Sequence, residues 1–586
     1  MEKLNKLRKL MLESGLDAYI ISSGDSHNNG YMPEYWSTRK WFSGFTGSSG
    51  LVVITATEAG LWTDGRYFIQ AAAQLANTGI DLYKMGEPNV PTYQKFLADK
   101  LPNGGNVGFD GRTFSAEDFA VLKRELHGQK FAFKYNNDLI DKLWADRPPL
   151  PTRAAYEHLP KYAGLCASEK LRNVREEMAD NNIDAYLVSA LDDVAWLLNI
   201  RGWDLPCVPV VYAYVLITAA DAFVFVDVAK VTDISSKLTS LGFTILPYEA
   251  VTEKLTELPA ENTILYTAAK TNVLVADVIS AKLAENKKNI IAYMKSQKTE
   301  TELANIKNAY IKEGVATTRL IKWVGEQIHA GKTITEDDVA EKMTSLRSAM
   351  DLYVCDSFST IAGYAANGAL PHYRHEGTGD TVKPDGFLLV DTGGQYLDGT
   401  TDTTRTFAVG SLTDEMKRDF TLVLKGHIAL STAVFLKGMT GHQLDMLARQ
   451  PILQSCQNYK HGTGHGIGYC LGVHEGPQGV AHKHSDVTLE IGMIISNEPA
   501  IYKEGRYGIH TENVLAVKEL CKNDNGIFYA FDDITYCPYD NRAMVKEMLT
   551  AAELEFVRVY HEKVQETLAP LLTEDERVWL KEYCDM

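Results

Sequence analysis

The sequence predicts a multidomain protein in which α/β domains precede a larger domain of α+β character. The chain has 586 residues, which is enough for about three or four domains of typical size. Its apolar content of 45 % and charged content of 23 % are those of a globular protein. An internal repeat in the first half and a cluster of histidines and glycines in the second half predict this division.

The repeat consists of a helical segment that leads into a short apolar strand. LRKLMLESGLDAYIISSGD near the N-terminus matches LRNVREEMADNNIDAYLVSALDD, so that Asp17-Ala18-Tyr19 aligns with Asp184-Ala185-Tyr186. A β-rich segment follows each copy, and there Ile54-Thr55 aligns with Ile217-Thr218. The pattern predicts one α/β domain that has been duplicated in tandem.

Two segments predict the domain boundaries. The Pro-rich run from Arg147 to Pro151 cannot continue a helix or a central strand and is typical of a linker. Further on, Thr299 and Glu302 have the spacing of a helix capping box, ahead of a helical pattern that reaches His329. We therefore predict domains at residues 1–155, 156–296 and 297–586.

Charge and hydropathy argue against several classes of protein. The chain has 59 Lys and Arg against 76 Asp and Glu, a net charge of −17, and no long basic run, so we expect no nucleic-acid partner. No apolar run is long enough to cross a membrane, and the N-terminus lacks the apolar core of a signal peptide. The eight cysteines form no CxxC pair. We therefore expect free thiols and a cytoplasmic location, with no membrane partner.

Candidate chemistry lies in the last domain, where ten of the 15 histidines fall between His372 and His510. In LLVDTGGQYLDGTTDTTRTF, Asp391 ends an apolar strand and Asp402 lies on a second, Thr-rich strand. Their separation of 11 residues allows both carboxylates to face one side of a hairpin, where a divalent cation would remove their repulsion. A solvated turn with two ordinary aspartates is the alternative.

Two further segments add histidines and glutamates. KHGTGHGIGYCLGVHEGP places His461, His465 and His474 in a glycine-rich loop, where the backbone can approach a ligand closely. In residues 491–517, Glu498 ends one apolar strand and Glu512 lies on the returning strand, so the two can face each other. A glutamate there is costly unless it is paired or metal-bound. The combined residues favour two hard divalent ions such as Mn²⁺, Co²⁺ or Mg²⁺.

These motifs resemble those of the pita-bread metallopeptidases, in particular the long, three-domain Xaa-Pro aminopeptidases (aminopeptidase P). The strings DTGGQYLDGTTDTTRT, HGTGHGIG, VHEGP and NEP carry the resemblance, which covers essentially the whole chain. It implies two creatinase-like N-terminal α/β domains followed by a pita-bread catalytic domain. It also implies release of the N-terminal residue from peptides with proline second, by attack of a metal-bound hydroxide on the Xaa-Pro carbonyl.

The resemblance implies a set of metal ligands. Two divalent ions, usually Mn²⁺ with Co²⁺ or Zn²⁺ as alternatives, would share Asp402 and Glu512 as bridges. Asp391 would hold one ion, and His465 with Glu498 would hold the other. Glu498 would also accept and shuttle the proton, which makes it a predicted catalytic residue.

The resemblance also implies substrate contacts and a partner. His372 matches a histidine that binds substrate and stabilises the intermediate, and His461 and His474 match histidines that line the proline pocket. All three are predicted to be catalytic and substrate-binding residues. Arg66, in WTDGRY, matches an arginine that contacts the peptide across the interface of a homodimer.

One position departs from the family pattern. His510 stands where many members have an arginine beside the last glutamate ligand. Histidine supplies less fixed positive charge than arginine, so the support of Glu512 differs here in detail.

Two other functions compete with the aminopeptidase. A prolidase, which cleaves Xaa-Pro dipeptides, has the same fold but one upstream domain, whereas this sequence shows two. Non-catalytic pita-bread proteins that bind peptides have lost metal ligands, whereas this sequence keeps all five. Methionine aminopeptidase lacks the repeated upstream domains, and creatinase uses no metal.

Overall fold

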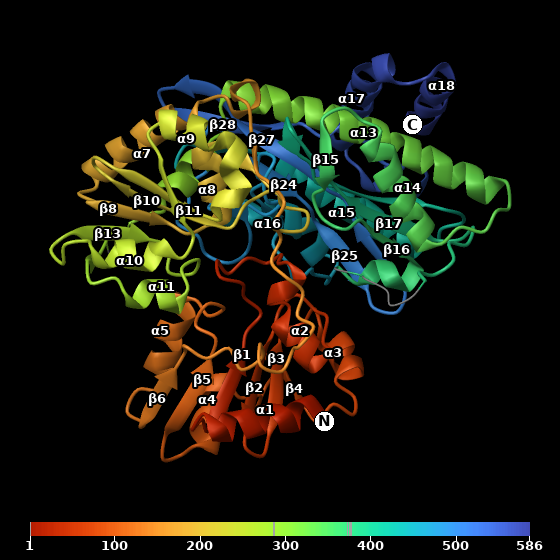
Figure 1. Cartoon of the computed structure of the whole chain (residues 1–586). Coiled ribbons are helices and arrows are strands. Elements are labelled where there is room, and N and C mark those ends of the chain that lie inside the picture. The colour runs from red at the N-terminus through yellow and green to blue at the C-terminus, as the bar shows by residue number, and fades with distance from the viewer. Residues whose placement is uncertain (1, 285–286, 372, 374–377, 586) are drawn as a thin grey trace. The chain divides into compact units, whose positions relative to one another are not determined.

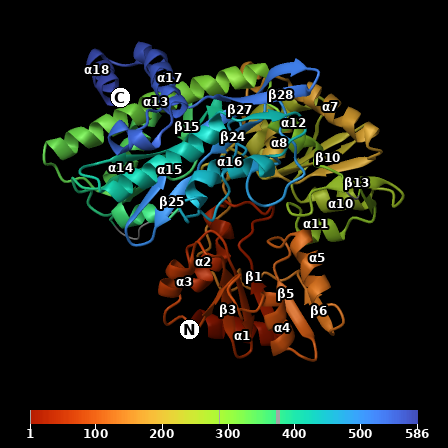
Figure 2. The ribbon, with the colours of Figure 1, turned by 180° about the vertical axis from the view of Figure 1, so that it is seen from behind.

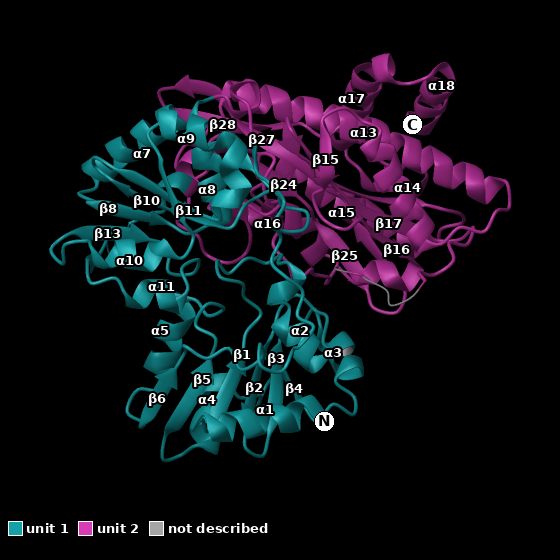
Figure 3. Cartoon of the chain, in the orientation of Figure 1, with its two compact units in different colours: residues 1–157, 165–291 teal, residues 158–164, 292–586 magenta. Residues whose placement is uncertain are grey.

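The computed structural model describes residues 2–284, 287–371, 373 and 378–585. The chain forms two compact units, one of residues 1–157 with 165–291 and one of residues 158–164 with 292–586 (Figure 3). The predicted boundaries near residues 155 and 296 stay predictions, because the first unit keeps both upstream domains together. In the described part of the chain, no helix combines the length and the apolarity that a membrane crossing requires.

The first unit contains two six-stranded sheets, seen in Figure 1 as the red-orange and the yellow-green strands. The first sheet has the order β4-β3-β2-β1-β5-β6, with β1 (Ala18–Ile21), β2 (Leu51–Thr55), β3 (Ala59–Thr63), β4 (Asp81–Lys84), β5 (Gly105–Phe109) and β6 (Phe131–Lys134). The second has the order β12-β11-β10-β8-β13-β14, with β8 (Ala185–Val188), β10 (Ala213–Thr218), β11 (Ala222–Val226), β12 (Thr244–Pro247), β13 (Thr263–Tyr266) and β14 (Lys282–Leu283). Read in chain order, the two topologies are the same.

The strand register confirms the predicted duplication. Ala18 pairs with Thr55 in the first sheet, and Ala185 pairs with Thr218 in the second. The aspartate before each of these alanines makes the same hydrogen bond in both copies. Asp17 Oδ2 accepts the backbone N–H of residue 106 at 2.7 Å, and Asp184 Oδ2 accepts that of residue 263 at 2.7 Å. Each carboxylate thereby satisfies a backbone donor at the end of a parallel strand pair.

In the first unit, helices alternate with the strands of these sheets in chain order. The longest is α7, and its first turn carries the acidic Glu169. The α-helices of five or more residues that lie wholly among the described residues of this unit are α1 (Glu2–Glu13), α2 (Thr38–Ser43), α3 (Phe68–Gln74), α4 (Tyr93–Lys100), α5 (Ala116–Glu125), α7 (Ala167–Asp180), α8 (Leu191–Leu198), α9 (Ser235–Ser240), α10 (Ala250–Thr256) and α11 (Val273–Asp277).

The longest helix of the second unit is α13 (Glu300–His329), and its first turn confirms the predicted capping box. Thr299 Oγ1 accepts the backbone N–H of Glu302 at 3.2 Å, and Glu302 Oε2 accepts the backbone N–H of Thr299 at 2.9 Å. The other long helices of this unit are α14 (Glu336–Ser348), α15 (Asp414–Ser431), α16 (Gly441–Leu453), α17 (Ala551–Leu568) and α18 (Glu574–Cys584). Helices α15 and α16 lie side by side (Figure 2).

Several small antiparallel sheets form the rest of the second unit. Two of them have the orders β16-β17-β20 and β15-β18-β19, with β15 (Tyr353–Asp356), β16 (Ile361–Tyr364), β17 (Phe387–Thr392), β18 (Gly394–Tyr396), β19 (Gly399–Thr400) and β20 (Thr403–Ala408). The others include β21-β28-β27-β24 and the pairs β22-β23 and β25-β26, with β21 (Val434–Leu436), β22 (Gly464–His465), β23 (Gly479–Val480), β24 (Ile494–Asn497), β25 (Ala500–Lys503), β26 (Tyr507–His510), β27 (Asn513–Asn523) and β28 (Gly526–Asp533).

Strand β17 separates two parts of the core. Leu388 and Val390 pack in a cluster with residues of α13 and α14, whereas Phe387 packs in a different cluster with Phe420 of α15. Because successive side chains of a strand point to opposite faces, Asp391 shares the face of Phe387. The period-two pattern of one strand thus places a carboxylate on the face away from α13 and α14.

Candidate metal centre

Asp391 and Asp402 lie on one face of the sheet β16-β17-β20, but they are not directly opposite each other. Asp391 pairs with Thr404, two residues beyond Asp402. The hairpin geometry expected from the sequence is therefore displaced by two residues. The reason is that residues between the two aspartates form their own short pairing, β18 with β19, instead of a simple turn.

Glu498 and Glu512 lie where two strand pairs are interrupted. On one side of the break Asn497 pairs with Asn513, and on the other side Ala500 pairs with His510. The register is the same on both sides, so it places Glu498 opposite Glu512, as the sequence predicted. The backbone N–H of Glu498 bonds to Thr463 O and that of Glu512 bonds to Thr404 O, which ties the break to the neighbouring segments.

His465 faces two of these carboxylates. Its Nε2 lies 3.5 Å from Asp402 Oδ2 and 3.5 Å from Glu498 Oε1. Its Nδ1 lies 2.9 Å from the carbonyl oxygen of Gly466, which can only accept a hydrogen bond. In the neutral ring Nδ1 therefore carries the proton, and the Nε2 lone pair faces two carboxylates. A cation at that point would turn this repulsion into attraction.

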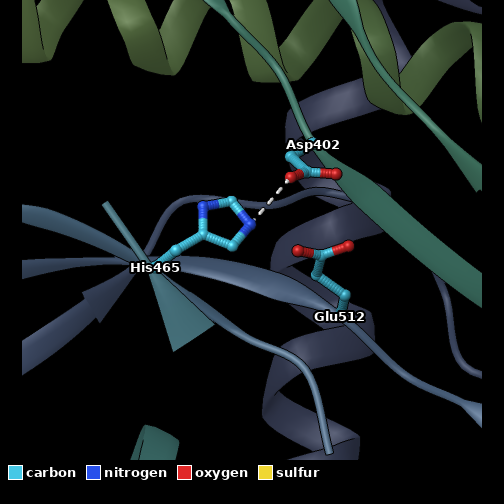
Figure 4. Close-up of side chains that lie close together, drawn as sticks. All are labelled: Asp402, His465 and Glu512. Atoms are coloured by element: carbon cyan, nitrogen blue, oxygen red, sulfur yellow. Dashed lines mark ion pairs between the residues drawn. The ribbon is translucent and has the colours of Figure 1, made fainter. Parts of the chain in front are cut away.

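Three side chains come together closely enough to hold one ion. Ligand atoms of Asp402, His465 and Glu512 all lie within 4.8 Å of one another. Figure 4 shows the three side chains pointing toward a common centre from β22 and from the residues next to β20 and β27. Asp402 and Glu512 are 4 % and 2 % exposed, so their charges have little access to water.

A layer of hydroxyl groups holds these residues in place. Thr404 Oγ1 donates to Glu512 Oε2 at 2.8 Å, and Ser496 Oγ donates to Glu498 Oε1 at 3.0 Å while it accepts the backbone N–H of His465 at 2.9 Å. Sequence reasoning did not assign a role to either hydroxyl. Only Thr404 left a signal, since it lies two residues after Asp402 and therefore on the same face of the strand.

Burial and mutual repulsion shift the pKa values of the four carboxyl groups in different directions. Burial raises the pKa of Asp391 to about 6. Burial and the neighbouring carboxylates raise the pKa of Asp402 and of Glu512 well above the usual range. The pKa of Glu498 is lowered, because the histidines around it, with His510 first, outweigh the effect of burial. The carboxylates repel one another most strongly at Asp402 and Glu512.

His510 lies beside Glu498. Its Nε2 is 3.4 Å from Glu498 Oε2, whereas the hydroxyl of Thr404 supports Glu512. His510 lies two residues before Glu512, so alternation places both side chains on one face of the strand. Glu498, opposite Glu512, lies on that face too, and the His510 ring reaches it across the strands.

The two histidines predicted to line a proline pocket both lie beside the candidate ligands. His461 Nδ1 is 3.9 Å from Glu498 Oε2, and the rings of His474 and His465 are 4.2 Å apart. Burial lowers the pKa of His461 to about 4, so its ring is neutral at neutral pH. Its Nδ1 lies 2.7 Å from the Gly462 carbonyl oxygen, so its Nε2 accepts the hydroxyl of Tyr502 at 3.1 Å. Tyr502 was not singled out in the sequence.

Two other predicted residues are not placed in this group. His372 lies outside the described residues. Arg66 belongs to the first unit, where its guanidinium group is exposed and bonds to both carboxylate oxygens of Asp64 at 2.8 Å. Their roles stay predictions.

Comparisons with known proteins match every part of this architecture. Residues 304–519 match Metallopeptidase family M24, and residues 527–586 match the C-terminal region of that peptidase. Residues 3–142 and 146–302 each match the Creatinase/Prolidase N-terminal domain. Aminopeptidase P2 of Arabidopsis thaliana is 37 % identical and aligns with 97 % of this chain and 86 % of its own. The chain belongs to metallopeptidase family M24.

Further relatives extend the M24 match over the full length. A probable Xaa-Pro aminopeptidase P of Laccaria bicolor is 37 % identical over 100 % of this chain and 93 % of its own. The crystal structure of X-prolyl aminopeptidase from Caenorhabditis elegans, described as a cytosolic enzyme with a di-nuclear active site, superposes with a TM-score of 0.93. It is 32 % identical and covers 100 % of this chain and 99 % of its own. The predicted resemblance, the predicted fold of two creatinase-like domains before a pita-bread domain, and the predicted hydrolase class are confirmed.

The residues of this M24 chain fit a pair of divalent cations. Asp391 Oδ1 is buried and accepts no hydrogen bond from the described residues, which leaves a lone pair for a metal. Four carboxylates and one imidazole are a donor set for borderline and hard divalent ions. Two such ions would also balance the charge of the four carboxylates, whereas one would leave a buried excess of negative charge.

Proposed function

We propose that the protein is an Xaa-Pro aminopeptidase that uses two divalent ions, Mn²⁺ foremost with Co²⁺ or Zn²⁺ as alternatives. It releases the N-terminal residue from peptides that have proline in the second position. The observation that carries the proposal is the position of His465 Nε2, 3.5 Å from the carboxylates of both Asp402 and Glu498. The full-length likeness to proteins named Xaa-Pro aminopeptidase supports the substrate class.

The ligand assignment is the one that the family resemblance implies, and the close approach of Asp402, His465 and Glu512 supports it. Asp402 and Glu512 would hold both ions, Asp391 would hold one of them, and His465 with Glu498 would hold the other. Bound ions of this kind polarise a carbonyl group and lower the pKa of water. The lowered pKa of Glu498 keeps it ionised at neutral pH, which is the form that binds a cation. Its role as proton acceptor is the one that the family resemblance implies.

The substrate side of the site follows from the bond to be cleaved. The amide before proline has no N–H group, and the proline ring fixes the φ angle of that residue. The enzyme must therefore recognise the proline ring rather than a backbone hydrogen-bond donor. We assign His461 and His474 to the walls of that proline pocket and His372 to substrate binding. Arg66 is assigned to the peptide through a homodimer, and the cytosolic location described for the Caenorhabditis enzyme is extended to this chain.

Removal and return of the metal tests the proposed reaction. Protein stripped with a chelator is expected to lose cleavage of an Xaa-Pro-Xaa tripeptide, because the carbonyl is no longer polarised, and to regain it with Mn²⁺. The measurement is release of the first residue, with an Xaa-Pro dipeptide assayed in parallel. Preferential cleavage of the dipeptide would identify a prolidase instead. Cleavage of neither peptide by the metal-loaded protein would favour a peptide-binding role.

The effect of Mn²⁺ on stability is expected to depend on pH. A carboxyl group with a raised pKa contributes stability that is lost as pH rises from its ordinary value of 3.8 to its folded value, which is about 6 for Asp391. Mn²⁺ binds the ionised carboxylates and offsets this loss. We therefore expect Mn²⁺ to raise the melting temperature more at pH 7.5 than at pH 5. An equal increase at both pH values would contradict the assignment, and Asp391→Asn should weaken the pH dependence.

A further inference from the structure

A buried ion pair lies directly behind the proposed metal ligands. Arg347 of α14 is 0 % exposed and Glu313 of α13 is 1 % exposed. The arginine binds this glutamate through two nitrogens, with Nη2 2.8 Å from Oε1 and Nε 3.0 Å from Oε2. Its remaining nitrogen donates to Asp356 Oδ1 at 2.6 Å. The geometry is that of a forked, charge-assisted pair with a fixed orientation.

Each member of the pair also contacts a threonine that neighbours a proposed ligand. Arg347 Nη2 donates to Thr392 Oγ1 at 2.5 Å, and Thr392 directly follows Asp391. Thr401 Oγ1 donates to Glu313 Oε2 at 3.1 Å, and Thr401 directly precedes Asp402. Because adjacent side chains in extended chain point to opposite sides, each threonine faces the helices while its aspartate faces the metal centre.

The glycine pair in the DTGGQ motif makes this contact possible. A Cβ atom on Gly394 would lie 2.4 Å from Arg347 Cδ, and one on Gly393 would lie 2.0 Å from the carbonyl oxygen of Thr401. The backbone N–H of Gly394 also donates to Thr401 Oγ1 at 2.8 Å. The segments that carry Asp391 and Asp402 are therefore pressed against each other and against the arginine.

We propose that Glu313 and Arg347 are positioning residues that set the separation of Asp391 and Asp402, a role that rests on the proposed metal centre. Arg347 holds the segment of Asp391 through Thr392, and Glu313 holds the segment of Asp402 through Thr401. Helices α13 and α14 thereby hold Asp391, which would bind one ion, and Asp402, which would bind both. Neither charged residue belongs to the proposed metal ligands or substrate contacts.

The test removes the threonine hydroxyls and leaves the charged pair intact. Substitution of Arg347 itself would leave a buried carboxylate unpaired and would disturb the fold, so it cannot isolate the positioning role. Thr392→Val and Thr401→Val keep the side-chain shape but lose every hydrogen bond of the hydroxyl, including those to Thr360 and Gly394. The variants Thr392→Ser and Thr401→Ser restore the hydroxyl. Thr318→Val is the matched control, because this buried threonine on α13 has a hydroxyl with no hydrogen-bond partner among the described residues.

The readout is Mn²⁺ binding to chelator-stripped full-length protein, measured by titration calorimetry. We expect the two valine variants to bind Mn²⁺ about 10- to 100-fold more weakly, as is typical when groups that orient metal ligands are removed. The serine variants and Thr318→Val are expected to bind with wild-type affinity. A merely structural role would lower the melting temperature of the metal-free protein without weakening Mn²⁺ binding.

The outcomes separate this inference from the proposed function. Wild-type Mn²⁺ affinity in both valine variants would overturn the positioning role even if the enzyme cleaves Xaa-Pro-Xaa peptides. Weakened Mn²⁺ binding together with a wild-type protein that cleaves no such peptide would support the positioning role and overturn the proposed function. A wild-type protein that binds no Mn²⁺, Co²⁺ or Zn²⁺ would overturn both.

Discussion

Asp402→Asn is expected to reduce kcat/KM for an Xaa-Pro-Xaa peptide by at least about 1,000-fold. Asparagine keeps the shape of the side chain but is neutral, so it cannot bridge two cations in the place of a carboxylate. Metal ions contribute several kcal/mol to transition-state stabilisation, and each 1.4 kcal/mol changes the rate tenfold. The bound metal, measured by elemental analysis, is expected to fall from two ions per chain to one or fewer.

The same substitution is not expected to destabilise the metal-free protein. Burial and neighbouring carboxylates raise the pKa of Asp402 well above its usual range, so the charged form is unfavourable without a cation. A neutral amide removes that repulsion, and the metal-free variant should melt at or above the temperature of the metal-free wild type at pH 7.5. A variant that loses activity but keeps its stability identifies a residue whose role is functional rather than structural.

Asp385→Asn is the matched control for this experiment. Asp385 is exposed, accepts a hydrogen bond from Ser411 Oγ at 3.1 Å and is not one of the proposed metal ligands. It should retain two ions and wild-type kcat/KM. Wild-type activity with two bound ions in Asp402→Asn would contradict the assignment of Asp402 as a bridging ligand.

Much of the fold could be predicted because the relevant interactions are local or repeated. Ala18 and Ala185 pair with the threonines that the repeat aligned, since two copies of one pattern fold with one register. The capping box of Thr299 was recognisable because its partner is three residues away. Glu498 faces Glu512 as expected, because the two strands keep one register across the break.

The supporting residues of the site could not be predicted because they come from distant segments. Glu313 and Arg347 lie on two helices, and nothing in their spacing connects them to Asp391 or Asp402. The position of His510 beside Glu498 depends on pairing across a sheet, which neighbouring positions in the sequence do not reveal. Motifs therefore located the proposed ligands, whereas long-range packing decides what holds them.

Gly464→Ala is expected to displace His465 and to reduce both stability and activity. A Cβ atom at this position would lie 1.8 Å from the carbonyl oxygen of Ser496, an atom of the neighbouring backbone that cannot rotate away. Ser496 Oγ accepts the backbone N–H of His465 at 2.9 Å and donates to Glu498 at 3.0 Å. Moving β22 away from β24 therefore separates two proposed ligands of the same ion.

The size of this effect follows from the size of the clash. Overpacking of this kind costs about 1–3 kcal/mol of folding free energy, and a misplacement of about 1 Å in a catalytic group can reduce the rate about 100-fold. Urea unfolding and kcat/KM for the tripeptide measure the two effects separately. Gly472→Ala, in the same glycine-rich segment, is the control because the nearest atom to its Cβ is His474 O at an ordinary 3.4 Å. If Gly464→Ala behaved like Gly472→Ala, the glycines of the HGTGHG motif would serve chain flexibility rather than the close approach of β22 to β24.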